Sequence, residues 1–141
     1  MAADCVFCDL IASNSAPWVT KEEQAVAFFP LPGSAIAPGH TLVVPRWHGE
    51  AGVLDVPPTD LAATVALVQR VSQAMMSKLG AGGVCVLNAS GPESGRSIDH
   101  LHFHVVPRYA GDGDDCLPWP TGKSPHQPAA DPRHLLAEAL R

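Results

Sequence analysis

The sequence has little that suits a membrane, secreted or nucleic-acid-binding protein. No run approaches the about 20 apolar residues of a membrane span, and Met1-Ala2-Ala3-Asp4 lacks the basic start and apolar core of a signal peptide. The formal net charge is −5, whereas a surface that grips nucleic acid needs a basic patch. We therefore expect a cytoplasmic protein without a membrane or nucleic-acid partner. A small anionic ligand stays possible, because a local cluster of Arg and His can oppose the overall sign.

Internal repeats and charge runs are also missing. The 141 residues suit one domain, which is large enough to bury a core without disulfides. A hydrophobic content of 46% and a charged content of 16% are typical of a soluble globular chain. We expect a single domain over residues 1–141.

Two cysteines near the N-terminus form a Cys-x-x-Cys pair, Cys5 and Cys8. This spacing serves zinc sites and redox dithiols, and it also occurs with free thiols. Redox pairs usually follow a strand and open a helix, but no strand precedes Cys5. The pair therefore favours zinc, provided that two further ligands exist.

The chain between residues 19 and 87 predicts three strands, one long helix and a further strand. Strands are expected at 19–22 and 25–29, joined by a polar turn, and at 40–45, which Pro45 closes. The helix is expected after Thr59 as N-cap and should end at Gly80. Its buried face is predicted from the helical spacing of Leu61, Val65, Val68, Ser72, Met75 and Leu79. The apolar run 84–87 is most simply a central strand beneath the helix, and a short helix is expected at 133–140, with Asp131 before it as N-cap and Pro132 at its first position.

The stretch from His100 to Arg108 alternates imidazoles with apolar residues. On a strand this alternation places His100, His102 and His104 on one face and the apolar residues on the other. A single strand histidine is usually structural. Three in strict alternation are hard to explain as packing, because each buried ring nitrogen needs its own partner.

This stretch resembles the signature of the histidine triad (HIT) family, His-φ-His-φ-His-φ-φ with φ apolar, at every position from His100 to Val106. The segment 38–45, Pro-Gly-His-Thr-Leu-Val-Val-Pro, is similar to a second family segment, and Arg46 and His48 continue it. The resemblance implies an α+β HIT fold: an antiparallel sheet of about five strands with one long helix packed on it. It also implies a homodimer, as in the Hint branch, with a core over 5–109 and a C-terminal loop and short helix over 110–141.

The resemblance assigns roles to the histidines. His102 is expected to be the nucleophile, His104 to contact the phosphate and leaving group and to stabilise or protonate what departs, and His40 to support the triad. Zinc-bearing members imply a structural Zn²⁺ at Cys5, Cys8, His48 and His100. The alternatives are an exposed His48 with free thiols, and a catalytic metal bound by the triad itself.

The resemblance also implies a substrate site, and the sequence departs from the family pattern at two of its positions. The expected substrate-binding residues are Phe29, Asn88, Gly95, Arg96, Ser97 and Trp119. Arg96 stands where members usually have Gln, which offers the phosphate a charged, bidentate partner. Pro30 stands where nucleotide-binding members tend to have an acidic residue for the ribose diol, so ribose recognition should be weakened.

The function that these residues imply is hydrolysis or transfer at a nucleoside α-phosphate through a nucleotidyl-histidine intermediate. Adenosine phosphoramidates or mononucleotide esters are the expected substrates. The alternative is a HIT-fold nucleotide-binding or regulatory protein with weak catalysis.

Overall fold

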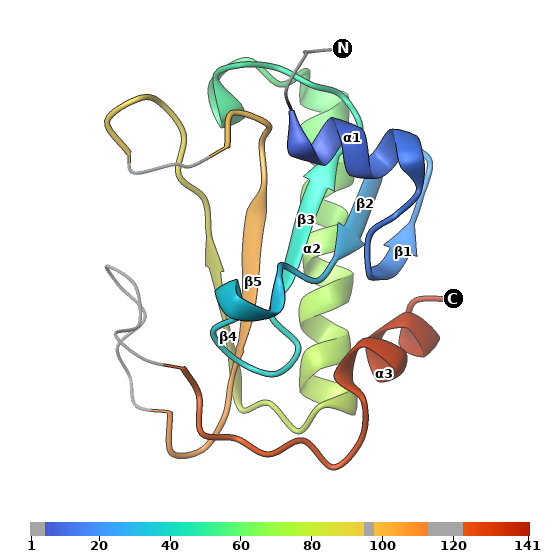
Figure 1. Ribbon diagram of the computed structural model, residues 1–141, viewed down its shortest axis with the longest axis vertical. Helices are drawn as coiled ribbons and strands as arrows, with labels where there is room; N and C mark the ends of the chain where they lie inside the picture. Colours follow the sequence, from blue (N-terminus) through green and yellow to red (C-terminus); the bar gives the residue numbers. More distant parts are fainter. Residues whose placement is uncertain (1–4, 95–97, 113–122) are drawn as a thin grey trace.

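A computed structural model describes residues 5–94, 98–112 and 123–141. Within them, five antiparallel strands form one sheet in the order β1-β2-β3-β5-β4 (Figure 1). The strands are β1 (Trp18–Lys21), β2 (Ala25–Phe28), β3 (Thr41–Pro45), β4 (Gly83–Leu87) and β5 (Phe103–Arg108). The helices are α1 (Val6–Ser13), α2 (Pro58–Lys78) and α3 (Pro132–Ala139), with short 3₁₀ turns η1 (Pro32–Ser34) and η2 (Gly52–Leu54). The predicted five-stranded antiparallel sheet and long helix are confirmed.

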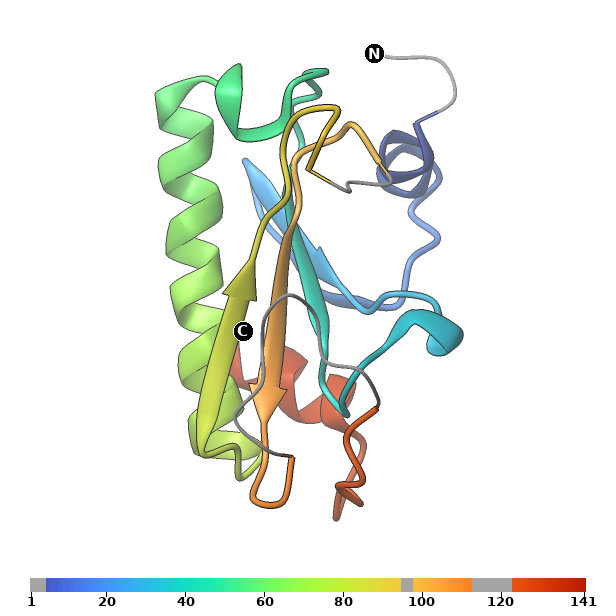
Figure 2. The same ribbon diagram turned by 90° about the vertical axis from the view of Figure 1, so that its left-hand side faces the viewer.

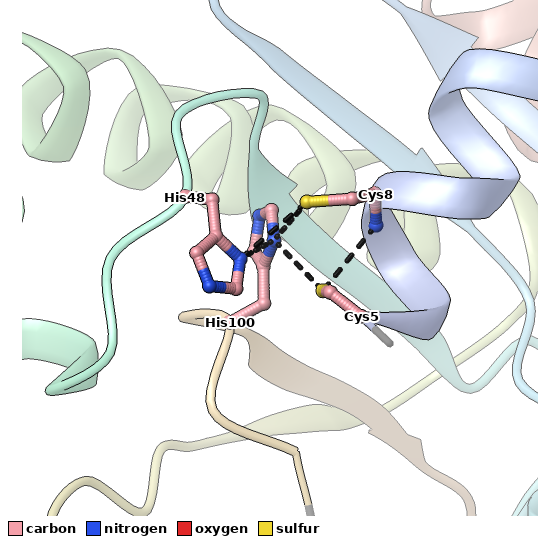
Figure 3. Close-up of side chains that lie close together, drawn as sticks. All are labelled: Cys5, Cys8, His48 and His100. Atoms are coloured by element: carbon pink, nitrogen blue, oxygen red, sulfur yellow. Dashed lines mark hydrogen bonds between the residues drawn. The ribbon is translucent and has the colours of Figure 1, made fainter. Parts of the chain in front are cut away.

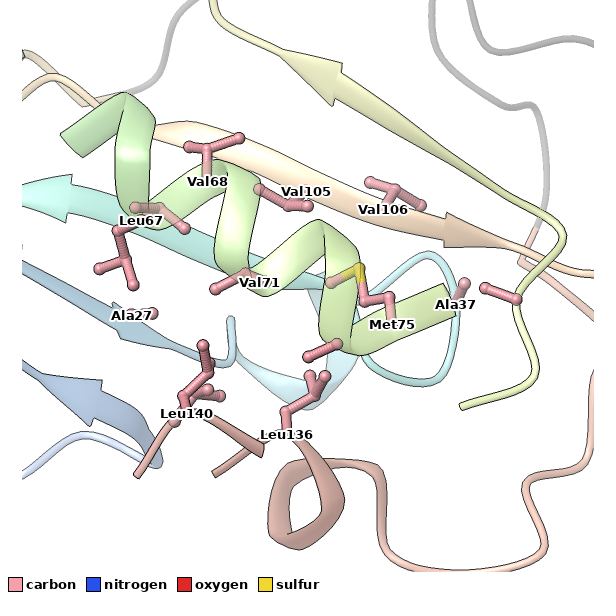
Figure 4. Close-up of a cluster of buried hydrophobic side chains, with 14 of the residues drawn as sticks. Ala27, Ala37, Leu67, Val68, Val71, Met75, Val105, Val106, Leu136 and Leu140 are labelled. Carbon is pink, nitrogen blue, oxygen red and sulfur yellow. The ribbon is translucent and has the colours of Figure 1, made fainter. Parts of the chain in front are cut away.

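The two faces of the sheet carry different helices. The long helix α2 covers one face, and α1 and the η1 loop lie over the other (Figure 2). The main core lies between α2, α3 and the sheet, where Leu67, Val71, Met75, Val105 and Leu136 are fully buried (Figure 4). A second apolar cluster anchors α1 on the opposite face, where the Phe7 and Phe28 rings meet edge to face at 5.5 Å.

The start and the buried face of α2 differ from the prediction. Pro57 is the N-cap and its side chain accepts no hydrogen bond, so the prediction of Thr59 was wrong. The buried face includes Thr64 and excludes Val65, which is 46% exposed. Thr64 can be buried because its hydroxyl donates a hydrogen bond to the carbonyl O of Asp60 at 2.7 Å. The prediction did not include Thr64 in the buried face, because it relied mainly on the spacing of apolar residues.

The strand β4 lies at the edge of the sheet, and the prediction of a central strand was wrong. The strand β5 lies between β3 and β4 and pairs with both. Val86 on β4 is 47% exposed, so a continuous apolar run here marks a half-covered edge strand.

The hairpin and the C-terminal helix agree with the prediction. β1 and β2 pair antiparallel within one residue of the expected bounds. The Asp131 carboxylate accepts the amide hydrogen of Arg133 at 3.1 Å, and Pro132 occupies the first position of α3.

Across the residues that the structure describes, no helix is both long and apolar enough to cross a membrane.

Candidate active site and metal cluster

The strand β5 and the residues just before it bring the triad to one face of the sheet. His100 is fully buried and His102 is 6% exposed. The His102 and His104 rings lie 5.2 Å apart between centroids, at 71°. Leu101 and Val105 are buried, and Val105 joins the core beneath α2. The alternation in the sequence therefore separates a packing face from a face of imidazoles.

The backbone fixes the tautomer of His102. Its Nδ1 lies 2.8 Å from the carbonyl O of His100, and a carbonyl can only accept, so Nδ1 carries the hydrogen. The other nitrogen, Nε2, then presents a lone pair. Burial lowers the pKa of His102, an effect that the bond to the His100 carbonyl partly opposes, so the ring is neutral at physiological pH. A neutral imidazole with a lone pair on Nε2 is a competent nucleophile.

His104 is paired with His40, from the turn before β3. The Nε2 of His40 lies 3.1 Å from Nδ1 of His104, and the amide of Ile36 donates to Nδ1 of His40 at 3.1 Å. Burial, with a smaller contribution from the His104 charge, lowers the pKa of His40 to about 3. Burial, with a smaller contribution from the His102 charge, lowers the pKa of His104 to about 4. Both rings are therefore neutral near pH 7.

These rings open onto a pocket of about 460 Å³ with a mostly apolar lining. His40, His102 and His104 are among the residues that line it. The rest of the lining comes from α1, from the end of β2 and the chain after it, from β3 and from the segment before β5, and includes Val6, Phe7, Leu10, Phe28, Phe29, Pro30, Leu31, Leu42 and Ile98. The pocket suits a ligand with an apolar, flat portion and a reacting group at the imidazoles.

The second cluster joins three segments that are far apart in the sequence. Cys5 and Cys8 come from the start of α1, His48 from the loop after β3, and His100 from the segment before β5 (Figure 3). Their four ligand atoms lie within 4.8 Å of one another. Cys5, Cys8 and His100 are buried, and His48 is partly exposed.

Four of the six spacings between these atoms lie close to those of a tetrahedral ion. Bonds of about 2.0–2.1 Å to nitrogen and about 2.3 Å to sulfur require ligand atoms about 3.3 to 3.8 Å apart. The Nδ1 atoms of His48 and His100 are 3.2 Å apart, and the sulfur–nitrogen distances are 3.4 Å for Cys8 to His48 and 3.6 Å for Cys5 and for Cys8 to His100. The Nε2 of His100 donates to the carbonyl O of Pro45 at 2.6 Å, which leaves Nδ1 unprotonated toward the thiols. The predicted ligand set is therefore assembled with the correct nitrogen of His100 facing inward.

Comparison with known proteins agrees with this geometry. The model of the HIT domain matches residues 13–111. The chain belongs to the HIT family.

Individual relatives extend the comparison. A HIT-like protein of Methanocaldococcus jannaschii is 34% identical over 111 residues, covering 78% of this chain and 83% of the relative. An adenosine 5′-monophosphoramidase of Saccharomyces cerevisiae is 29% identical over 119 residues, covering 84% and 71%. The crystal structure of a Zn-bound histidine triad family protein from Mycobacterium smegmatis superposes with a TM-score of 0.79 at 29% identity, covering 97% of this chain and 93% of that protein.

The structure of this HIT protein places one of the predicted substrate-binding residues at the pocket and another elsewhere. Phe29 lines the pocket, and so does Pro30, at which the sequence differs from the family pattern. Asn88 uses its amide to bind the chain itself, since Nδ2 donates to the carbonyl O of His102 at 3.0 Å and Oδ1 accepts from Ser90 at 2.8 Å. Gly95, Arg96, Ser97 and Trp119 lie outside the described residues.

Two residues of the site were missed at the level of sequence. Phe7 contacts His102 edge to face at 5.2 Å between ring centroids, and its place between the two cysteines of the Cys-x-x-Cys pair was a usable signal. Ile36 contributes only its backbone amide to His40, and nothing in the sequence marks that contact.

Proposed function

We propose that this HIT protein hydrolyses or transfers the nucleotidyl group of a nucleotide substrate, with His102 attacking the α-phosphorus. The observation that carries the proposal is the bond from Nδ1 of His102 to the His100 carbonyl at 2.8 Å, which leaves a lone pair on Nε2 of a ring that lines the pocket. The activity named for the Saccharomyces cerevisiae relative supports an adenosine phosphoramidate as the substrate. A mononucleotide ester is the second substrate class that we propose.

The reaction has two displacements. In the first, the lone pair of His102 Nε2 forms a bond to the α-phosphorus while the bond from phosphorus to the leaving group breaks, and that electron pair departs with the leaving group. The ring becomes cationic, so its Nδ1–H bond to the His100 carbonyl becomes charge-assisted and stronger. In the second, a water oxygen bonds to phosphorus, the pair of the phosphorus–nitrogen bond returns to Nε2, and the water's proton goes to solvent.

The pocket supplies binding and orientation for this reaction. Of its lining residues, Phe7 and Phe29 suit a nucleobase, and the imidazoles of His102 and His104 suit the phosphate. A substrate held in this way presents its phosphorus to Nε2 without a further search for orientation.

Zinc belongs to the same proposal as a structural ion. Cys5, Cys8, His48 and His100 are the residues that hold it, and the Zn-bound relative from Mycobacterium smegmatis supports the choice of metal. A site closed by four protein ligands ties segments together and leaves no position for substrate. The homodimer and the cytoplasmic location remain predictions beside this function.

The test is a search for the covalent intermediate. The protein is mixed with adenosine 5′-phosphoramidate, quenched at alkaline pH and analysed by mass spectrometry after proteolysis. We expect an adenylyl group on His102 and hydrolysis to AMP. In His102→Ala both should vanish, because alanine has no nucleophilic nitrogen. Since the ring is only 6% exposed, thermal unfolding of the variant checks that it still folds.

The other outcomes separate the alternatives. An adduct that persists in His102→Ala contradicts the assignment of the nucleophile. Binding of AMP without turnover of any nucleotide in a screen indicates a binding or regulatory protein. Loss of metal from His102→Ala, with metal retained in Cys5→Ala, indicates a catalytic metal held by the triad.

A further inference from the structure

The hydrogen bonds around His40 constrain its protonation. The Ile36 amide can only donate, and it donates to Nδ1 of His40 at 3.1 Å, so that nitrogen must hold a lone pair. A histidine with one unprotonated nitrogen is neutral and carries its hydrogen on the other. The hydrogen of His40 therefore lies on Nε2.

The hydrogen on His40 in turn determines the protonation of His104. The Nε2–H of His40 lies 3.1 Å from Nδ1 of His104, so it donates and Nδ1 of His104 accepts. An imidazolium at His104 needs a hydrogen on Nδ1, which then faces another N–H. The pair is compatible with one state of His104 only, a neutral ring whose hydrogen is on Nε2.

We propose that His40 is a positioning residue that, together with the Ile36 amide, locks His104 as an uncharged Nε2–H donor beside the lone pair of His102. The inference rests on the proposed function for its catalytic meaning, although the lock itself is a property of the free protein. It assigns His104 to stabilising charge on the phosphate and excludes it as the general acid. The hydrogen on Nε2 remains with His104, and a leaving amine takes its proton from solvent.

Further hydrogen bonds hold the Ile36 amide and the His40 ring in place. His40 is 2% exposed, and its own amide donates to the carbonyl O of Ala37 at 3.0 Å, which closes the turn that carries the ring. The carbonyl of Ile36 accepts the amide hydrogen of Ser124 at 2.7 Å. The Ser124 hydroxyl in turn donates to Asp112 at 2.5 Å, and the side chain of Asp112 is 3% exposed. The C-terminal segment thus holds the residue whose amide sets the tautomer.

An uncharged donor differs from a general acid in what it does during the reaction. A neutral N–H aimed at a phosphate oxygen stabilises the charge that develops there without a proton transfer. His102 and His104 then present opposite groups on neighbouring rings, a lone pair and a donor. A second lone pair at His104 would instead repel the phosphate oxygens.

The test uses two matched replacements of His40. Glutamine carries an acceptor and a donor side by side, so H40Q can accept from Ile36 and donate to His104. An ionised glutamate has acceptors only, so H40E requires a hydrogen on Nδ1 of His104. Nitrogen-15 NMR of labelled histidine reads the tautomer directly, with the His104 resonances assigned from H104Q.

We expect His104 to carry its hydrogen on Nε2 in the wild type and in H40Q, and on Nδ1 in H40E. A carboxylate raises the pKa of a neighbouring imidazole, so kcat is compared at a pH where the spectrum shows His104 of H40E to be neutral. There, with adenosine 5′-phosphoramidate, H40E should lower kcat by on the order of 100-fold, the loss typical of a missing charge-stabilising donor. H40Q should lose much less, and KM should change little in either variant. Equal losses of kcat in H40Q and H40E would mean that the ring of His40 matters only for packing.

The wild-type spectrum alone can overturn the inference. A hydrogen on Nδ1 of His104 in the folded wild type contradicts the lock, even if both variants fail to fold. Because the spectrum requires no turnover, it also separates the two proposals. Absence of the His102 adduct with the expected tautomer refutes the function, whereas the adduct with the wrong tautomer refutes only the lock.

Discussion

The metal cluster and the pocket are built from neighbouring histidines of one segment, yet they use opposite nitrogens. His100 donates Nε2–H to the Pro45 carbonyl and turns an unprotonated Nδ1 to the thiols. Two residues later, His102 donates Nδ1–H to the His100 carbonyl and turns Nε2 to the pocket. The residue type is the same, and the backbone acceptor that each ring finds decides its chemistry.

The two regions also differ in how they hold the chain together. The cluster joins residues 5–8, 48 and 100, and so ties α1 to the body of the protein. The pocket depends on that tie, because Phe7 lies between the two cysteines and packs on His102. The comparison therefore predicts that damage to the cluster reaches the pocket.

Loss of a thiol should have the largest effect. Cys5→Ala and Cys5→Ser should both reduce zinc from about one ion per chain to a trace, because a closed tetrahedral site needs four ligands. We expect the melting temperature to fall by at least about 5 °C, and AMP to bind more weakly. Elemental analysis, thermal unfolding and calorimetry measure the three effects.

The serine variant serves as the control for capping. Cys5 is the N-cap of α1, and its sulfur accepts the amide hydrogen of Cys8 at 3.4 Å. Serine keeps an acceptor there, so any stability that Cys5→Ser regains over Cys5→Ala measures the cap. Reduced wild-type protein that holds no metal after refolding with zinc would sink the assignment. Unchanged AMP binding in the metal-free variants would show that the two regions are independent.

Acid should lower the stability of the folded protein through His40 and His104, the paired histidines of the pocket. Their pKa values, about 3 and about 4 in the folded protein, lie below the ordinary histidine value of 6.5. Below pH 6.5 the unfolded chain gains protons that these folded rings do not. The stability that the two neutral rings contribute is therefore complete above pH 6.5, and it is lost progressively as the pH falls to about 4 for His104 and to about 3 for His40.

The measurement is thermal unfolding of wild type and H40Q between pH 7.5 and 5, with zinc present throughout. Both proteins keep the metal ligands, so the difference between them isolates the His40 side. The melting temperature of H40Q should fall less on acidification than that of the wild type. Parallel curves would mean that the low pKa of His40 does not contribute to acid sensitivity.

Prediction from sequence succeeded where local pattern and structure coincide. The strand from Thr41 to Pro45 and the Asp131 cap each depend on neighbours in the chain. The strand expected from His100 begins only at Phe103, so of the three histidines of the triad only His104 lies in it. The expected metal ligands came from the family resemblance, and the fold assembles them.

The remainder depends on contacts that no local pattern records. Thr64 is buried because its hydroxyl meets a carbonyl one turn away, and β4 is an edge strand because β5 enters between it and β3. The tautomers of His40 and His104 follow from a backbone amide of a loop residue. Ile36 could be replaced by most residues without changing that amide, so its side chain carries no signal.

The smallest expected effect concerns Pro30, which lines the pocket. The family resemblance places a carboxylate here to accept hydrogen bonds from the ribose diol, and proline has no side-chain acceptor. A hydrogen bond to a charged acceptor contributes roughly 1.5–3 kcal/mol, which corresponds to about ten-fold or more in discrimination between a ribonucleotide and its deoxy analogue. We therefore expect the wild type to discriminate weakly and Pro30→Asp to gain about ten-fold in the ratio of kcat/KM for matched ribo- and deoxyribo-substrates.

Pro30→Asn is the control, since it has the same shape as aspartate without the charge and should gain less. Pro30→Ala reports any effect of losing the ring at the end of β2. A wild-type ratio already well above ten would mean that another residue binds the sugar. In that case the ribose, like the phosphate at the imidazoles, would have a binding residue of its own in the pocket.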